Sequence, residues 1–542
     1  MSNAIFNVPY PKNDPVRAYL PGSAERSALK AELEKQSSEL IKIPLIIGGK
    51  EIFTETLMDF TMPCDHGHVL AKFSIAEKEH LQMAIDASLK AKSDWESMPW
   101  EMRASIFLKA AELLSGPYRY QLNAATMLGQ AKTVFQAEID SACELVDFLR
   151  FNFYFAEQIF KIQPENSAGV WNRSLYRPLE GFIMAISPFN FTAICGNLCT
   201  APAMLGNTIV WKPATTAILS NYYFMKLLME AGLPSGVINF IPSRGADVSK
   251  HVLSHPNLAA VHFTGSTRVF QDIWSQISNN IANYRSYPRL VGETGGKDFV
   301  FAHKTADIDA LVAALVRGAF EYQGQKCSAA SRAYIPESLW PIIKEKLLCA
   351  IKSIKMGDVR DFTNFLGAVI DSSSFKNIAG YIDRAKADPN AELLCGSYDD
   401  SKGYFISPTV ILCKNPDHQT MVDEIFGPVL SIYVYADNKL EQTLEVCNSS
   451  SPYALTGSVF ARDRQAIMIM SKALQNAAGN FYINDKPTGA VVGQQPFGGG
   501  RSSGTNDKSG SALNLFRWLS VQTIKENLLP IYDIEYPYMK EK

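Results

Sequence analysis

The chain has 542 residues, more than one hydrophobic core usually serves, so we expect at least two domains. Hydrophobic residues make up 47% and charged residues 20%, and the net charge of -2 gives no electrostatic case for binding nucleic acid or an anionic membrane. The nine cysteines include no Cys-x-x-Cys pair, which favours free thiols in a reducing compartment.

The N-terminal sequence gives no targeting signal. Met1-Ser-Asn-Ala-Ile-Phe6 lacks the basic and apolar regions of a secretory signal and the Arg-rich pattern of a transit peptide. No apolar run reaches the roughly 18 to 20 residues of a membrane-spanning helix. We therefore expect a cytoplasmic protein with no membrane partner, or a mitochondrial matrix protein if the chain is eukaryotic and mature.

The first quarter of the chain reads as largely helical. Between residues 77 and 114 apolar positions recur at helical spacing, with Pro99 separating two helices, and residues 124–155 predict one further long helix. Before them, Cys64-Asp-His-Gly-His68 offers side chains that could bind a metal. Asp-His-Gly is typical of a turn, however, and zinc sites recruit more Cys or His at set spacing, so we expect no metal.

From residue 174 onward, segments with strand and helix patterns alternate. Residues 174–186 begin with alternation and end as a buried strand, and the alternation then continues over residues 208–212, 222–231, 237–241, 248–254, 259–264 and 269–281. A second series starts near residue 297, with a helix over 307–322, a strand over 330–335 and a helix over 340–351, and runs to about residue 484. Such alternation predicts two doubly wound α/β domains.

Cys327 and Glu293 are the residues with the clearest chemical meaning. Cys327 lies among small polar residues in Gln325-Lys-Cys-Ser328, thirty-four positions after Glu293. A thiol with a carboxylate that can activate water is what covalent catalysis at a carbonyl carbon requires. Either residue alone is more often a packing or surface residue. Five further motifs accompany the pair in a fixed order: Ser187-Pro-Phe-Asn-Phe191, Trp211-Lys-Pro-Ala214, Phe263-Thr-Gly-Ser-Thr267, Glu424-Ile-Phe-Gly-Pro428 and Gln495-Pro-Phe-Gly-Gly499.

Together these motifs resemble the NAD(P)-dependent aldehyde dehydrogenase superfamily along nearly the whole chain. The resemblance implies a cofactor domain over residues 1–290 that includes an N-terminal helical region, a catalytic domain over 291–500, and a return to the cofactor domain over 501–542. It also implies a small β-flap, formed by residues 169–181 and the segment after about Ser520, that pairs with another subunit. A homodimer or larger homo-oligomer is therefore expected.

The resemblance implies that the catalytic residues are Cys327, Glu293 and Asn190. The Cys327 thiolate would attack the aldehyde carbon, and the amide of Asn190 would bind the resulting oxyanion together with the backbone N–H of Cys327. After hydride transfer a thioester remains, and Glu293 would deprotonate the water that hydrolyses it.

The cofactor segment lacks the Gly-x-Gly-x-x-Gly fingerprint. Its counterpart is Thr264-Gly265-Ser266, where a strand ends and a helix begins, although a simple helix cap explains the same tripeptide. The resemblance implies cofactor contacts from Ser187, Pro188, Lys212, Thr215, Gly245, Phe263, Thr264, Gly265, Ser266, Glu424 and Phe426. Many NAD-using members have Glu where this chain has Thr215, so NAD is expected with NADP as a weaker alternative.

The run from Thr488 to Gly499, with Ser503-Gly-Thr-Asn-Asp-Lys508 behind it, resembles the Δ1-pyrroline-5-carboxylate dehydrogenase family. That resemblance implies oxidation of L-glutamate γ-semialdehyde to L-glutamate in proline catabolism. The substrate contacts would come from Glu144, Phe191, Ser328, Gly489, Ala490 and Phe497. Backbone N–H groups at Gly489 and Ala490 would bind the α-carboxylate.

Two observations leave alternatives open. Some members of that family carry Ser where this chain has Ala490, so one hydroxyl contact is missing here. Another semialdehyde, such as succinate semialdehyde, therefore remains a competing substrate. A non-catalytic structural homologue is the alternative from another class, because a fold alone does not establish a function.

Overall fold

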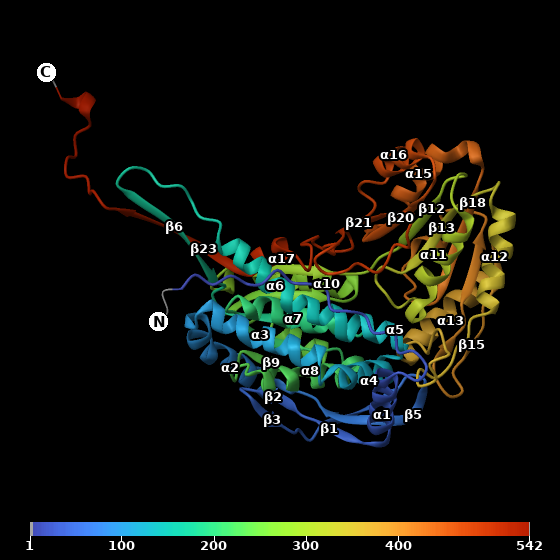
Figure 1. Ribbon diagram of the computed structural model, residues 1–542, viewed down its shortest axis with the longest axis horizontal. Helices are drawn as coiled ribbons and strands as arrows, with labels where there is room; N and C mark the ends of the chain where they lie inside the picture. The colour runs from blue at the N-terminus through green and yellow to red at the C-terminus, as the bar shows by residue number, and fades with distance from the viewer. Residues whose placement is uncertain (1–3, 541–542) are drawn as a thin grey trace.

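The computed structural model describes residues 4–540 and contains two large β-sheets with helices on both faces (Figure 1). The first sheet has the spatial order β11 (Arg289–Glu293), β10 (Leu258–Thr264), β7 (Phe182–Ile186), β8 (Thr208–Lys212), β9 (Ile238–Phe240), β2 (Leu45–Ile47) and β3 (Lys50–Ile52). Neighbours from β11 to β9 are parallel, whereas β2 is antiparallel to both β9 and β3. The parallel strands therefore end at one common edge.

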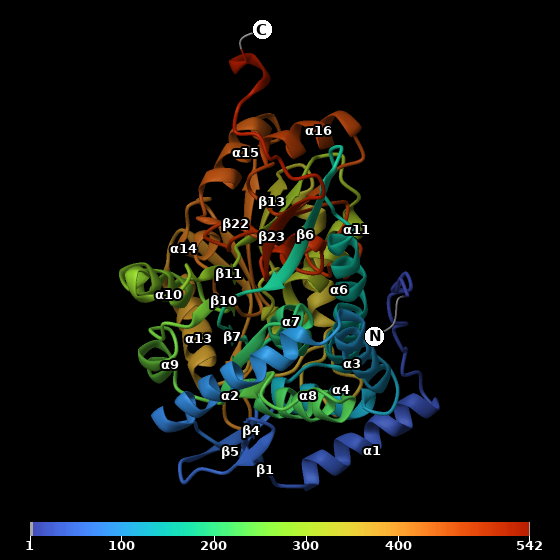
Figure 2. The same cartoon turned by 90° about the vertical axis from the view of Figure 1, so that its left-hand side faces the viewer.

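Different helices cover the two faces of the first sheet because successive strand residues point to opposite sides. Phe182 and Met184 pack with α2 (Lys78–Ser97), α9 (Gly245–His251) and α10 (Thr267–Asn279). Ile183 and Ala185 pack with the cluster that includes α3 (Trp100–Ser115), α4 (Arg119–Gln130), α6 (Leu145–Phe160), α7 (Thr192–Met204) and α8 (Ile218–Ala231). The view in Figure 2 places α9 and α10 on the side away from α3 and α6.

The second sheet follows the same plan. Its spatial order is β14 (Ala391–Cys395), β17 (Thr409–Cys413), β18 (Val429–Tyr435), β13 (Ala330–Pro336), β12 (Asp298–Ala302), β20 (Thr456–Phe460) and β21 (Asn480–Ile483), and only β14 is antiparallel to its neighbour. One face packs against α11 (Ile308–Phe320) and α12 (Trp340–Lys352). The other packs against α13 (Ser372–Ala387), α15 (Leu440–Ser449) and α16 (Arg464–Ala473). Both sheets are doubly wound, so the predicted fold class is confirmed.

A two-stranded ribbon projects from the body of the molecule. β6 (Val170–Pro178) and β23 (Leu519–Asn527) pair antiparallel over their whole lengths, and the C-terminal segment continues beyond them (Figure 1). The smaller elements are α1 (Ala24–Ser38), β1 (Ile41–Ile43), β4 (Leu57–Met62), β5 (Asp65–Ser74), α5 (Val134–Ala137), the π-helix η1 (Glu138–Glu144), the 3-10 helices η2 (Thr215–Ala217), η3 (Ile281–Asn283), η4 (Glu321–Gly324), η5 (Asp437–Lys439) and η6 (Pro537–Met539), β15 (Tyr398–Asp399), β16 (Phe405–Ile406), α14 (Gln419–Val422), β19 (Tyr453–Ala454), β22 (Gly500–Arg501) and α17 (Ala512–Phe516).

Two local expectations differ from the structure. The single helix expected over 124–155 is instead α4, α5, η1 and α6, because Ala131 adopts a left-handed φ of 54° and the hydrogen-bond register then shifts into the π-helix. The single strand expected over 174–186 is divided into β6 and β7. Gly181 lies between them with φ 125°, and a Cβ there would lie 2.1 Å from the carbonyl oxygen of Asn257.

Candidate active site

Most of the predicted catalytic and substrate residues surround one cavity of about 450 Å³, called here the catalytic cavity. The predicted residues that line it are Cys327, Glu293, Glu144, Phe191, Ser328, Gly489, Ala490 and Phe497, together with Phe263 and Thr264. They come from both α/β units and from loops that are far apart in the sequence. A pocket of this volume is in the range that small-molecule sites occupy.

The loop before Cys327 has an unusual backbone that its surroundings hold in place. Tyr322 and Gln323 have left-handed φ values of 53° and 55°, and both are fully buried. The Gln323 side chain donates to the carbonyl oxygens of Ala131 and Ala368 at 3.0 and 2.7 Å. Non-glycine residues in this conformation are uncommon and cluster at functional sites. The loop therefore presents Cys327 to the cavity from a fixed backbone.

The Cys327 thiol lies in an environment that disfavours its anion. Burial is the largest cause that raises its pKa well above the ordinary value, and the nearby carboxyl groups of Glu293, Asp298, Glu424 and Glu144 raise it further. The thiol is thus protonated at neutral pH in this arrangement. A nucleophilic thiolate requires a neighbouring group that accepts its proton.

Glu293 lies at the end of a strand, and its side-chain carboxyl group lines the catalytic cavity. It is the last residue of β11, and its backbone oxygen accepts a hydrogen bond from Gly265 N at 3.2 Å. Burial raises the pKa of its side chain to about 8, while Lys508 opposes and Asp507 adds to that shift. A carboxyl group with this pKa exchanges a proton near neutral pH, as a general base must.

Asn190 lies beside the nucleophile loop rather than among the residues lining the cavity. The turn from β7 to α7 carries it, and its side-chain Nδ2 donates to the carbonyl oxygen of Gln325 at 3.1 Å. This bond joins residues 135 positions apart in the sequence, and because Gln325 precedes Cys327 by two positions, it brings Asn190 close to Cys327. One of the two Nδ2 hydrogens is left free by this bond.

A buried ion pair fixes the start of α7, where Asn190 and Phe191 lie. Lys132 Nζ is 2.7 Å from Asp140 Oδ2, and both side chains are fully buried. The Asp140 carboxylate accepts from the backbone N–H groups of Thr192 and Ala193 at 3.0 and 2.8 Å, the first two residues of α7. A carboxylate at a helix N-terminus satisfies free donors and complements the helix dipole.

The same lysine contacts the Phe191 ring. Lys132 Nζ lies 3.9 Å from the centre of that ring and 4.5 Å from the centre of the Tyr322 ring. Phe191 lines the catalytic cavity, whereas Lys132 does not. The ammonium group therefore supports Phe191 from behind through a cation–π contact.

Glu144 ends the π-helix η1 and lines the cavity. Burial raises its pKa to about 8, and the charges of Asp140, Asp147 and Glu293 add to the shift while Lys132 opposes it. π-helical turns occur mostly as local bulges, frequently at functional sites. Here the bulge places Asp140 at the start of α7 and Glu144 at the cavity.

The predicted anchor for the substrate carboxylate lies on a loop opposite Ser328. The Ser328 hydroxyl is 2.8 Å from that of Thr488, and Lys486 Nζ donates to the Thr488 carbonyl oxygen at 3.2 Å. Gly489 follows with φ 97°, a conformation that L side chains rarely adopt. Phe497 is held at the far end of the loop by reciprocal backbone bonds with Ser509 at 3.0 and 2.7 Å.

Several predicted cofactor residues lie at the carboxyl edge of the first sheet. Ser187, Lys212 and Thr264 follow or end the adjacent strands β7, β8 and β10. Burial lowers the pKa of Lys212, and its ammonium group has no hydrogen bond or ion pair with any residue in the range 4–540. Dinucleotides bind at this edge of open α/β sheets. The free, half-buried Lys212 and the strand ends fit such a cofactor.

Some of these residues also have local structural contacts. Ser266 caps α10, since its hydroxyl accepts from Val269 N at 3.4 Å, and Gly265 N is already bonded to the Glu293 backbone. The Ser187 hydroxyl accepts from Trp211 Nε1 at 3.0 Å. The other predicted cofactor residues at this edge are Pro188 beside Ser187, the half-buried Thr215 at the start of η2, Phe263 in β10 and Gly245, which is the exposed first residue of α9.

Glu424 and Phe426 approach the crevice from the second α/β unit. Gly296 N donates to Glu424 Oε1 at 3.0 Å, and burial raises the pKa of that carboxyl to about 7. Phe426 has a left-handed φ of 57°, and its ring meets the Phe189 ring edge-on at 5.8 Å between centroids. Phe189 belongs to the same turn as Asn190. The structure therefore joins this predicted pair to the turn that carries the predicted oxyanion donor.

Between residues 4 and 540 the structure contains no group of three or more His, Cys, Asp or Glu side chains placed to hold a metal ion. His66, in the segment considered above, instead contacts the Asp400 carbonyl oxygen at 2.9 Å. In the same range no helix has the length and apolar character needed to cross a membrane.

With this geometry established, comparison with known proteins decides the family. The sequence pattern of the aldehyde dehydrogenase family matches residues 52–524. The chain belongs to the aldehyde dehydrogenase family. The predicted superfamily is thereby confirmed, and the motifs around Cys327 and Glu293 fall within the matched region.

Several relatives within the aldehyde dehydrogenase family are named Delta-1-pyrroline-5-carboxylate dehydrogenase. The chain is 55% identical over 540 residues to the mitochondrial Delta-1-pyrroline-5-carboxylate dehydrogenase of Dictyostelium discoideum, covering 99% of this chain and 97% of that protein. It is 48% identical over 530 residues to the mitochondrial human protein of that name, covering 97% of this chain and 94% of that protein. The crystal structure of the Mycobacterium tuberculosis Delta-pyrroline-5-carboxylate dehydrogenase bound with NAD matches with TM-score 0.96 and 50% identity, covering both chains fully.

Other residues around the catalytic cavity of this aldehyde dehydrogenase were not predicted from the sequence. They include His262, Lys326, Lys486 and Lys508. The His262 ring contacts the Leu198 carbonyl oxygen at 2.9 Å, and burial lowers its pKa to about 3. The sequence did point toward Lys508, because this residue ends the Ser503–Lys508 segment that resembles the Δ1-pyrroline-5-carboxylate dehydrogenase family. Lys326 also lies in a motif, the Gln325–Ser328 run around Cys327, whereas His262 and Lys486 lie outside the motifs.

Proposed function

We propose that the chain oxidises L-glutamate γ-semialdehyde, the open form of Δ1-pyrroline-5-carboxylate, to L-glutamate with NAD as hydride acceptor, the last oxidation of proline catabolism. One observation carries the assignment. Cys327, Glu293 and all six predicted substrate residues line a single cavity, in a chain that is half identical to dehydrogenases of this name along its whole length.

The first chemical step forms a bond between Cys327 Sγ and the aldehyde carbon. The thiol proton must leave as the bond forms, and the Glu293 carboxylate in the same cavity is a suitable acceptor. The carbonyl oxygen then carries a negative charge. The free Nδ2 hydrogen of Asn190 and the backbone N–H of Cys327 would bind that oxyanion.

Conversion to the acid needs an oxidation followed by hydrolysis. NAD, when bound by the residues at the carboxyl edge of the first sheet, supplies the acceptor for the hydride on the tetrahedral carbon. Loss of hydride leaves the acyl group on Cys327 Sγ as a thioester. Glu293 first releases the thiol proton to solvent and then removes a proton from water, and the hydroxide attacks the acyl carbon. The carbon–sulfur bond breaks to release the carboxylic acid, and the Cys327 thiolate takes a proton back from Glu293.

Substrate selection follows from the two ends of the cavity. Gly489 and Ala490 would bind the α-carboxylate through backbone N–H groups, with Ser328 nearby, and Phe191 and Phe497 would flank the aliphatic chain. Glu144 lies in the same cavity and is suited to the substrate's α-amino group. Only a substrate with an aldehyde, a carboxylate and an α-amino group uses all of these contacts, and succinate semialdehyde lacks the amino group.

Assembly and compartment complete the proposal. We infer a homo-oligomer in which the β6–β23 ribbon pairs with another subunit. We also infer that the chain divides into a cofactor domain over residues 1–290, a catalytic domain over 291–500 and a return to the cofactor domain over 501–542. For the compartment we propose the cytoplasm, or the mitochondrial matrix if the chain is the mature form of a eukaryotic protein. Support for the second location comes from eukaryotic relatives whose names include the word mitochondrial.

The test is NADH formation from Δ1-pyrroline-5-carboxylate, measured beside succinate semialdehyde and a simple alkyl aldehyde. We expect the highest kcat/KM for the first compound. The Cys327→Ala variant is the control and should form no NADH while still binding NAD. A higher kcat/KM for succinate semialdehyde would contradict the substrate assignment, and substantial turnover by the variant would contradict the covalent mechanism.

A further inference from the structure

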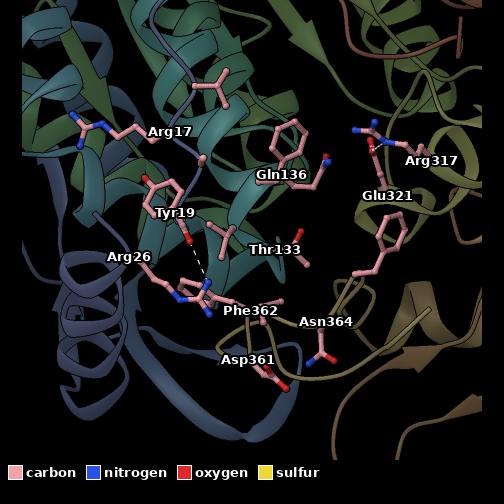
Figure 3. Close-up of a pocket in the computed structure, with 16 residues that line it drawn as sticks. Arg17, Tyr19, Arg26, Thr133, Gln136, Arg317, Glu321, Asp361, Phe362 and Asn364 are labelled. Carbon is pink, nitrogen blue, oxygen red and sulfur yellow. Dashed lines mark hydrogen bonds and ion pairs between the residues drawn. The ribbon is translucent and has the colours of Figure 1, made fainter. Parts of the chain in front are cut away.

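A second cavity of about 590 Å³ adjoins the catalytic cavity (Figure 3). It lies between the N-terminal segment, α5, the end of α11 and the loop over residues 359–365. Val16, Phe135, Arg317 and Glu321 line both cavities. The two cavities therefore share part of their walls.

Two arginines of the second cavity retain free hydrogen-bond donors. Arg26 makes one side-chain bond, from Nη1 to the Tyr19 carbonyl oxygen at 3.1 Å, and its guanidinium lies 4.9 Å from the centre of the Phe362 ring. Arg317 makes one bond, from Nε to Glu321 Oε1 at 2.8 Å. A guanidinium has five N–H donors, so each can still bind a carboxylate with a pair of parallel bonds.

The other charged groups around the cavity differ in what they leave free. Arg17 donates to the Tyr120 hydroxyl and the Ser115 carbonyl oxygen and keeps three donors. Glu321 pairs with both Arg317 and Lys326, whose Nζ lies 3.2 Å from its second oxygen. Asp361 is exposed at the rim, where it accepts from Thr363 N. Arg26 and Arg317 are the cations that lie on the two sides of the hollow (Figure 3).

The amide of Gln136 is open to the same space. The residue is 3% exposed overall and lines the second cavity, and its amide makes no hydrogen bond with the described part of the chain. Figure 3 shows Thr133 and Gln136 between Arg26 on one side of the hollow and Arg317 on the other. The amide atoms reach the cavity, so they are available to water or to a polar ligand there.

We propose that this second cavity binds a short dicarboxylate, with one carboxylate at Arg26 and the other at Arg317 and Gln136. The aromatic rings of Phe135 and Phe362 would contact the aliphatic part between them. The identity of the natural ligand rests on the proposed function: L-glutamate has two carboxylates, whereas its semialdehyde has one. The second cavity therefore distinguishes the product of the reaction from the substrate.

The test compares glutarate with pentanoate, which has the same carbon chain and one carboxylate, on the full-length enzyme. Crystals soaked with glutarate should show it between Arg26 and Arg317. In calorimetry, Arg26→Met and Gln136→Leu should each weaken or remove this binding, with a loss of roughly tenfold to a hundredfold for the arginine, the value of a charge-assisted hydrogen bond. Neither residue lines the catalytic cavity. Arg464→Met, which removes an exposed arginine on α16, is the matched control.

Three results would each overturn the inference: glutarate found only in the catalytic cavity, equal affinity in the unmodified enzyme and in both cavity variants, or pentanoate bound as tightly as glutarate. Thermal unfolding of each variant checks that it is folded. Because Arg26→Met and Gln136→Leu are tested separately, the inference can still be tested if one of them does not fold. The NADH assay above uses no glutarate, so its outcome separates failure of the proposed function from failure of this site.

Discussion

Cys327, the proposed nucleophile, has four carboxyl groups near enough to raise the pKa of its thiol. Reactive thiols usually have a cation or a helix N-terminus nearby that stabilises the thiolate. Here Glu293, Asp298, Glu424 and Glu144 instead raise the pKa of the thiol. The charge on the sulfur must therefore form during attack rather than before it, which makes the protonation state of Glu293 decisive.

The first prediction concerns pH. Burial raises the pKa of Glu293 to about 8, and only the carboxylate acts as a base, so steady-state turnover should rise as the pH increases to about 8 and then level off. Glu293→Gln should lower turnover by roughly 10² to 10⁴ and remove this dependence. The burst of about one NADH per active site should also become slower, because Glu293 accepts the thiol proton before hydride transfer.

Glu144→Gln is the control for that prediction, because Glu144 has a similar pKa of about 8 in the same cavity. It should retain the rise with pH while raising the KM for the substrate. Stopped-flow and steady-state NADH measurements across pH 6 to 10 check both variants. An unchanged pH profile in Glu293→Gln would assign the base to another group.

The second prediction concerns cofactor choice at Thr215. A Glu at this position would bind the adenosine ribose hydroxyls and repel a 2′-phosphate, whereas a threonine leaves the phosphate unopposed near Lys212. We expect a preference for NAD with measurable NADP activity, and Thr215→Glu should suppress the NADP reaction selectively. The ratio of kcat/KM values for the two cofactors is the readout. The same ratio in the variant would show that Thr215 does not face the 2′ position.

At the scale of elements, the N-terminus of α7 depends on the buried pair of Lys132 and Asp140. Lys132→Met should lower the free energy of unfolding by about 3 to 5 kcal/mol, because it leaves Asp140 charged and unpaired in the interior. Lys132→Met combined with Asp140→Asn should recover most of the loss, since no charge is then buried. Denaturant unfolding measures both. Lys90→Met, on the exposed side of α2, is the control and should have an effect within about 0.5 kcal/mol.

Contrary results for this pair have a clear meaning. A Lys132→Met variant as stable as the unmodified enzyme would show that Asp140 is not held as an anion. A double variant no more stable than the single one would locate the energy in the contacts of Lys132 with Phe191 and Tyr322 instead.

The same elements show what the sequence could predict. Cys327, Glu293 and the loop of Gly489 lie in short motifs, and local patterns place each at the end of a strand or in a loop. Lys132 and Asp140 lie in no motif, and a charged residue in a helical stretch is expected at the surface. The π-helix that brings Asp140 to α7 and Glu144 to the cavity arises from a shifted hydrogen-bond register. Apolar periodicity predicted only a continuous helix there.

The whole molecule carries a projecting ribbon with exposed apolar residues among charged ones. On one face of the β6–β23 ribbon lie Trp171, Leu175 and Ile524 together with the ion pair of Arg173 and Glu526, since residues opposite each other across the strands point the same way. Trp171 is 51% and Leu175 48% exposed. A two-stranded ribbon is marginally stable alone, and both of its edges are open to pairing. These features fit the expected contact with another subunit.

The last prediction tests that contact. Trp171→Glu combined with Leu175→Glu should reduce the mass of the particle in solution, because carboxylates would have to be buried without partners at the subunit contact. Neither residue lines the catalytic cavity, so NADH formation per chain should persist in the smaller species. Light scattering after size-exclusion chromatography measures the mass. Met468→Glu, at a 71% exposed position on α16, introduces the same charge elsewhere and should leave the mass unchanged. If the ribbon variant kept the mass of the unmodified protein, the subunits would have to associate through another surface.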